Sequence, residues 1–229
     1  MTGLRGVGTT VVFSVAVLCL LTLGAPSASA DTFTSTLDTG NTALSGLSAP
    51  FAEVSVTLTS STMATVTFTS DVVNGNIYLF GGAQAVDVNV NAASWTIGSF
   101  TASNSGTGFT PGILTDGGSN NADGFGVFNQ TVDSFDGFTH SSDDISFVLT
   151  NTSGTWASAA NVLTGNADGL DAAAHIFVTS FPADQSNGAL VTGFAAEGAT
   201  TAAPEPSSFA LLLTGLIGFV GARRRKSLA

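Results

Sequence analysis

Residues 53–59 read Glu-Val-Ser-Val-Thr-Leu-Thr, a strict alternation of polar and apolar side chains. A second alternating run, residues 64–69, follows after a short polar connection. Successive side chains of an extended strand point to opposite faces, so each run buries one face and exposes the other. Two such runs around a short loop predict a β-hairpin with one buried face.

Other short segments have the same character. They are rich in β-branched or aromatic residues and are separated by clusters of Gly, Asn, Asp and Ser: 76–80, 86–90, 94–100, 145–150, 175–181 and 189–195. Helical periodicity is unconvincing between residues 31 and 203, although 157–163 is predicted to form a short helical turn. This pattern predicts an all-β domain over residues 31–195, an antiparallel β-sandwich or jelly roll. A β-helix is the alternative, but no fixed repeat period supports it.

The N-terminus has the features of an export signal. Arg5 precedes an apolar stretch at 11–23, and the small residues Ala28 and Ala30 then form an A-x-A cleavage site. Residues 1–30 are therefore predicted to be a signal peptide. It would be recognised by the Sec translocon and removed, so that the mature chain begins at Asp31.

The C-terminus carries three features in a fixed order. Residues 196–207 are a small, polar stalk that ends in the motif Pro204, Glu205 and Pro206. Residues 208–222 lack charge and are predicted to form one transmembrane helix, roughly 23 Å long and so a marginal span. Four cations follow in the tail 223–229: Arg223, Arg224, Arg225 and Lys226. Basic residues beside a membrane helix stay in the cytoplasm, which places the preceding domain on the other side.

Together these tail residues resemble the PEP-CTERM sorting signal of exopolysaccharide-producing Gram-negative bacteria. The resemblance covers the Pro-Glu-Pro motif, the apolar helix and the terminal basic cluster. It implies that an exosortase, a membrane-embedded enzyme, cuts the chain near the motif. The protein would then pass from an inner-membrane intermediate to the cell surface or the extracellular matrix.

The charges are divided between the ends and the middle of the chain. All five Lys and Arg residues lie before residue 31 or after residue 222, whereas 15 of the 16 acidic residues, all except Glu205, lie within 31–203. Each of these carboxylates must be solvated, bonded to backbone N–H groups or bound to a metal cation. Nucleic-acid binding is excluded, because neutralising phosphates needs cations. A polyanionic partner would be repelled unless divalent cations bridged the two.

A Gly-rich stretch at 116–124 is the best candidate for a metal site. Asp116, Asn120, Asn121 and Asp123 would offer hard oxygen ligands on a loop, as Ca²⁺ requires, although the spacing is not that of an EF-hand. Residues 166–171 are a weaker case. Ordinary turn chemistry explains both stretches equally simply, since Asn, Asp and Gly dominate turns.

Catalytic patterns are weak, and the sequence predicts no enzyme. His140 is followed by two serines and two aspartates, but adjacency does not give triad geometry and no G-x-S-x-G elbow is present. Asp133, Asp136, Asp143 and Asp144 could supply carboxylate pairs for glycoside hydrolysis. Most aromatic residues are expected in the core. The sequence thus favours a structural or binding protein of an exopolysaccharide matrix or biofilm. A Ca²⁺-dependent carbohydrate-binding module is the alternative and a matrix-glycan hydrolase comes third.

Overall fold

The computed structural model describes residues 31–197 as one antiparallel β-domain with no α-helix in that range. Its twelve strands are β1 (Asp31–Gly40), β2 (Ala52–Ser60), β3 (Met63–Ser70), β4 (Val72–Val73), β5 (Asn76–Phe80), β6 (Val86–Val88), β7 (Trp95–Ser103), β8 (Thr115–Ala122), β9 (Gly126–Asp133), β10 (Asp144–Asn151), β11 (Ala172–Ser180) and β12 (Val191–Glu197). Four single-turn 3₁₀ helices lie in the connections: Thr42–Leu44, Phe138–His140, Ala159–Asn161 and Gln185–Asn187.

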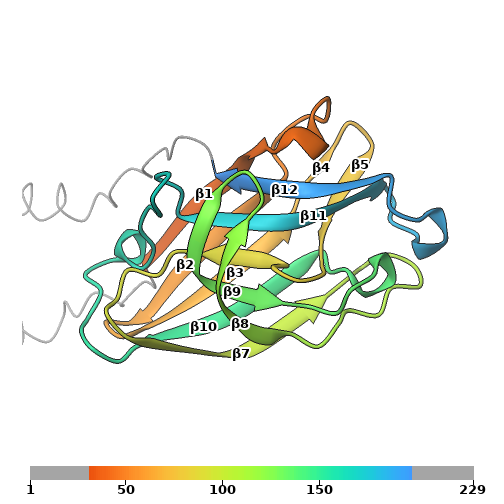
Figure 1. Cartoon of the computed structure of the whole chain (residues 1–229). Helices are drawn as coiled ribbons and strands as arrows, with labels where there is room; N and C mark the ends of the chain where they lie inside the picture. Colours follow the sequence, from red (N-terminus) through yellow and green to blue (C-terminus); the bar gives the residue numbers. More distant parts are fainter. Residues whose placement is uncertain (1–30, 198–229) are drawn as a thin grey trace, which may run out of the picture.

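All twelve strands belong to one hydrogen-bonded sheet. Its order is β7-β10-β3-β2-β1-β12-β11-β6-β9-β8, with β5 paired to β11 beside β6 and β4 paired to β5. The sheet curls so that β7 and β8, at its two ends, contact each other (Figure 1). The prediction of an antiparallel all-β domain is confirmed. The strands form one nearly closed sheet, however, instead of the two separate sheets of a simple sandwich.

The predicted hairpin forms β2 and β3, in which Val56 lies opposite Val66. Val54, Val56, Val66 and Phe68 are buried, whereas the threonines and serines between them point outward. These side chains join the main core, which fills the inside of the curled sheet and also receives Phe147 from β10. Alternation along the strands therefore produces the core directly.

A second, smaller core lies on the outer face of the sheet. The β8–β9 hairpin leaves the sheet edge and crosses in front of β11 and β12 (Figure 1). Phe125 and Phe128 of the hairpin pack there against Ala173 of β11 and Ala196 of β12. Small residues on β11 and β12 leave room for the crossing hairpin.

The boundaries show where the sequence prediction succeeds and where it differs. Residues 76–80 form β5 as predicted, and the 157–163 turn contains the 3₁₀ helix Ala159–Asn161. The strands β1, β4, β8 and β9 were not predicted. Finally, β12 continues through Glu197, two residues beyond the end predicted for the domain.

Candidate functional site

A pocket of about 410 Å³ opens where β9 ends and β8 begins. It is lined by Ala83, Ile113, Thr115, Asp133, Ser134, Phe135 and Asp136. This volume lies within the range of small-molecule sites, roughly 300–1,000 Å³. Asp133 and Asp136 were proposed from the sequence as a carboxylate pair, and the structure brings both into this pocket.

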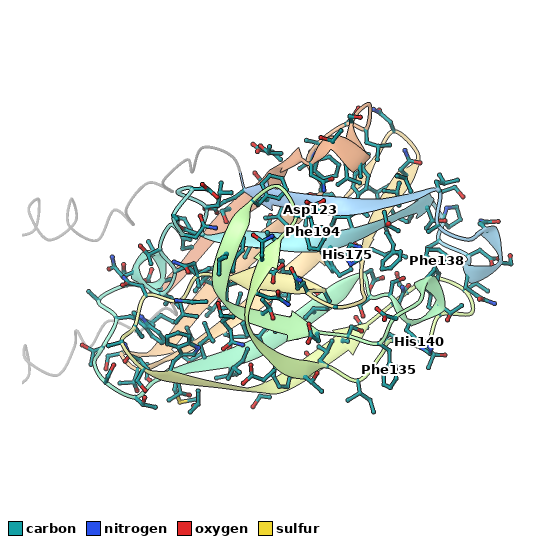
Figure 2. All side chains as sticks on the ribbon, viewed as in Figure 1. Asp123, Phe135, Phe138, His140, His175 and Phe194 are labelled. Carbon is teal, nitrogen blue, oxygen red and sulfur yellow. The ribbon has the colours of Figure 1, made fainter. Side chains whose placement is uncertain are left out.

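The pocket combines carboxylates with exposed apolar side chains. Phe135 is 58 % exposed and Ile113 is 73 % exposed. The ring of Phe135 lies 5.8 Å from that of His140, tilted by 50° (Figure 2). Nδ1 of His140 donates to the Thr110 carbonyl oxygen over 2.9 Å, which fixes the imidazole beside the phenyl ring. The result is an aromatic surface next to hydrogen-bond acceptors.

Backbone contacts hold the acidic side of the pocket. Oδ1 of Asp133 accepts from the Gln84 backbone N–H at 2.8 Å, and the Ser134 N–H donates to the Gly82 carbonyl at 3.0 Å. Gly82 has φ +76°, a left-handed conformation that suits glycine. The β5–β6 connection is thereby tied to the end of β9. Oγ of Ser134 is buried with no hydrogen-bond partner among the described residues.

A buried carboxylate lies in the neighbouring strand. Asp87 of β6 is 0 % exposed, and neither of its oxygens has a hydrogen-bond partner within residues 31–197. Burial, and secondly the charge of Asp133, raise the pKa of Asp87 well above its ordinary value. Sequence reasoning missed this residue, because alternation in 86–90 places it on the face opposite the buried valines. The sequence feature that could have identified Asp87 is an aspartate between two valines in a domain without Lys or Arg.

His175 of β11 is a further titratable group near the pocket residue Asp136. Its ring stacks on Phe194 at 4.7 Å with an interplanar angle of 8° (Figure 2). A side chain at Gly82 would contact both His175 Nδ1 and Asp136 Oδ1, so both atoms lie close to this glycine. Burial lowers the pKa of His175, although backbone groups and Asp136 act in the opposite direction. The aromatic stacking and half-buried position agree with a packed, structural histidine.

The four predicted metal ligands do not lie together. The stretch predicted as a loop is strand β8, which carries Asp116, Asn120 and Asn121, and Asp123 lies in the turn that follows it. Since a strand rises about 3.3 Å per residue, Asp116 and Asp123 are separated by roughly 20 Å. A single Ca²⁺ ion therefore cannot take all four ligands. Within residues 31–197, no group of three His, Cys, Asp or Glu side chains is arranged to hold a metal ion.

The side chains of the predicted metal ligands also have different hydrogen-bond partners. Oδ1 of Asp116 accepts from Gln130 Nε2 at 2.8 Å and from the Gly118 N–H at 2.9 Å. The side chain of Asn120 caps the N–H of the next residue, and that of Asp123 contacts Asn41 Nδ2 at 3.3 Å. The weaker 166–171 stretch is a turn in which Asn166 Oδ1 accepts from two backbone N–H groups.

The residues around His140 form no triad. Oγ of Ser141 donates to the Phe138 carbonyl at 2.7 Å, and Ser142 is 0 % exposed. Asp143 binds the Ser105 N–H at 2.7 Å, and Asp144 accepts from Thr69 Oγ1 at 3.1 Å. Asp143 immediately precedes β10 and Asp144 begins it, and both carboxylates already accept hydrogen bonds. Neither residue lines the pocket.

The large aromatic residues mostly belong to the core, as expected. Tyr78 is 0 % exposed and Trp156 is 3 % exposed. Nε1 of Trp156 donates to the Asn91 carbonyl at 2.8 Å, and Nε1 of Trp95 donates to Gln130 Oε1 at 2.9 Å. Phe135 is the aromatic residue that the structure leaves exposed in the pocket.

Several predicted sites lie outside the described residues. They are the signal-peptide residues Ala28 and Ala30, the motif Pro204 to Pro206, and the cluster Arg223 to Lys226. Asp31, the predicted mature N-terminus, is the first residue of β1, and its Oδ2 accepts from the Ala159 N–H at 2.6 Å. Within 31–197, no helix has the length and apolarity needed to cross a membrane.

Comparison with known proteins identifies the C-terminal signal. Residues 202–226 match the family model described as the PEP-CTERM protein-sorting motif. The chain therefore carries this motif at its C-terminus, as the sequence predicted. No curated protein and no solved structure matches the chain. The motif supports an extracellular protein that is sorted by an exosortase in a Gram-negative bacterium.

Proposed function

We propose that this protein is a non-enzymatic binding component of the exopolysaccharide matrix, delivered there after an exosortase removes its C-terminal tail. The PEP-CTERM motif supports the route. The observation that carries the binding role is the pocket in which Asp133 and Asp136 lie beside exposed Phe135. On this proposal the pocket takes a segment of the polysaccharide.

The chemistry of the pocket suits a sugar. Carboxylate oxygens are acceptors for sugar hydroxyl groups. The phenyl ring of Phe135 offers an apolar face against which the C–H face of a sugar ring packs. The charge of the domain selects among glycans, because residues 31–197 contain 15 acidic residues and no Lys or Arg. A neutral polysaccharide is thus favoured over a polyanionic one.

Binding is tested with isolated matrix polysaccharide and the full chain in detergent. Phe135→Ala removes the stacking face, and Asp136→Asn removes one acceptor charge without changing size. Each variant is expected to weaken retention on the polysaccharide by about five- to 150-fold, since stacking and one charged hydrogen bond each contribute about 1–3 kcal/mol. Phe181→Ala, an exposed phenylalanine away from the pocket, is the matched control. Unchanged retention by Phe135→Ala and Asp136→Asn would contradict the proposal.

A hydrolase is the second candidate, because two carboxylates share one pocket. Retaining and inverting glycosidases both use a carboxylate pair. Turnover of matrix glycan by the wild type, and its loss in Asp133→Asn and Asp136→Asn, would favour this reading. Binding of the polysaccharide without its hydrolysis would favour a non-enzymatic matrix component. The Ca²⁺-dependent module remains a proposal as well, which the same retention assay distinguishes when it is repeated with EDTA.

A further inference from the structure

We propose that Asp87, Thr131 and Asp133 form a Ca²⁺ site between the paired strands β6 and β9, beside Gly117 of β8. The site is distinct from the residues predicted from the sequence, and it does not depend on the polysaccharide proposal. Three side chains from two adjacent strands supply it.

The three side chains lie on one face of the sheet. Asp87 is directly opposite Thr131 in the antiparallel β6–β9 pair, so their side chains point the same way. Asp133 follows Thr131 by two residues along β9 and therefore shares that face. The valines between them, Val86 and Val132, point inward to the main core.

The polar atoms of Thr131 and Asp133 also converge in space. A side chain at Gly117 of β8 would collide with Thr131 Oγ1 and would lie 2.8 Å from Asp133 Oδ2. Both oxygens thus border the same small space above a residue that has no side chain of its own. Asp87 and Thr131 are fully buried, so this side of the group is shielded from solvent.

These atoms lack partners within the protein. Thr131 and Asp87 are both 0 % exposed, and neither Thr131 Oγ1 nor either Asp87 oxygen has a hydrogen-bond partner among residues 31–197. An unpaired buried carboxylate is strongly unfavourable, more so beside a second one. No Lys or Arg occurs in the described range to neutralise the pair. A bound cation would satisfy both carboxylates and the hydroxyl together.

The ligand set indicates which cation. It consists of oxygen atoms alone and carries two negative charges, which match one divalent ion. Ca²⁺ accepts carboxylates, hydroxyls, backbone carbonyls and water in flexible geometry, whereas Mg²⁺ demands a near-ideal octahedron. Zn²⁺ prefers nitrogen and sulfur ligands. The ion would connect β6 to β9 and fix the Asp133 carboxylate at the wall of the pocket.

The test is Ca²⁺ binding to the full chain in detergent after treatment with EDTA and dialysis. Calorimetry is expected to show one Ca²⁺ per chain. At a hundredfold excess of Ca²⁺ over Kd, the Tm should rise by roughly 5–10 °C, and by less in NaCl of equal ionic strength. Asp87→Asn should weaken binding at least tenfold, and Thr131→Val, which keeps the shape and removes the hydroxyl, severalfold. Thr131→Val tests the site independently if Asp87→Asn does not fold.

Asp123→Asn is the control, since it makes the same change at an exposed aspartate of the hairpin turn. It should bind Ca²⁺ as the wild type does. Equal Tm shifts from Ca²⁺ and NaCl, or full binding by both Asp87→Asn and Thr131→Val, would overturn the proposal. Loss of binding in Asp123→Asn alone would also overturn it, because the ion would then lie in the turn.

Discussion

Glu197, the last residue of β12, is a buried acid whose partner is a backbone group. It is 2 % exposed, and its Oε1 accepts from the Asp171 N–H at 2.8 Å. Oε2 has no hydrogen-bond partner within the described part of the chain. Burial raises the pKa of Glu197, and the charges of Asp171 and Asp38 add to this, whereas the Asp171 N–H and the Ser35 side chain oppose it.

The raised pKa predicts a pH-dependent stability. The folded state binds this proton more tightly than the unfolded state, so the stabilisation is present at low pH and is lost as pH rises through the folded pKa of Glu197. Glu197→Gln keeps the acceptor Oε1 and removes the charge. Its Tm should exceed that of the wild type by a few degrees at pH 7–8, and the difference should disappear toward pH 4. Thermal melts across this range measure it.

A matched variant separates this effect from total charge. Glu53→Gln removes the same charge at an exposed position of β2. It should change the Tm little at any of these pH values, since exposed surface substitutions usually have small effects. An equal gain in Glu53→Gln and Glu197→Gln would attribute the gain to net charge and contradict the assignment to Glu197.

Single residues show the limit of sequence reasoning most clearly. Alternation correctly buries Val86 and Val88, and it places Asp87 on the outer face, as the structure does. The hairpin that covers that face comes from residues 115–133, far along the chain, so the burial of Asp87 is a tertiary effect. The pairing of Asp133 with Asp136 in one pocket was among the carboxylate pairs considered, but local sequence gave no means of choosing it.

At the scale of the elements, strands with one buried face were predictable and strand β8 was not. The alternating segments of β2, β3 and β10 were placed within one or two residues, because the buried positions have a period of two. Strand β8 reads Thr-Asp-Gly-Gly-Ser-Asn-Asn-Ala, a composition typical of turns. Its pairing with β9, with shifts around Gly118, overrides this local preference.

A methyl group added at Gly117 of the β8–β9 hairpin is expected to destabilise the protein. Gly117→Ala places a Cβ against Thr131 Oγ1 and near Asp133 Oδ2. Overpacking of this kind costs about 1–3 kcal/mol, so the free energy of unfolding should fall by that amount. Denaturant titration of the full chain measures the change.

Gly98→Ala on β7 is its control. A Cβ at Gly98 would meet no atom within 4 Å, and a glycine-to-alanine change in a strand reduces the entropy of the unfolded chain. This variant should be neutral or slightly stabilised. A loss of stability in Gly98→Ala equal to that in Gly117→Ala would show that the contact over Thr131 is not the cause.

At the scale of the whole molecule, charge and sorting signal are separated along the chain. The described domain carries 15 carboxylates without Lys or Arg, whereas the matched motif at 202–226 contains the terminal basic cluster. Sequence reasoning identified the motif because its parts occur in a fixed order near the end of the chain. The nearly closed sheet was beyond it, since the pairing of distant strands such as β11 with β5 and β6 has no local signature.

The central claim is that the tail is removed during export. The most direct measurement is mass spectrometry of the protein recovered from the cell surface or extracellular matrix. We expect peptides from residues 31–197 and none that extend beyond about residue 207. In a strain that lacks the exosortase, the same protein should retain its tail and remain with the inner membrane. Intact Arg224 or Lys226 in most of the mature surface protein would contradict the claim.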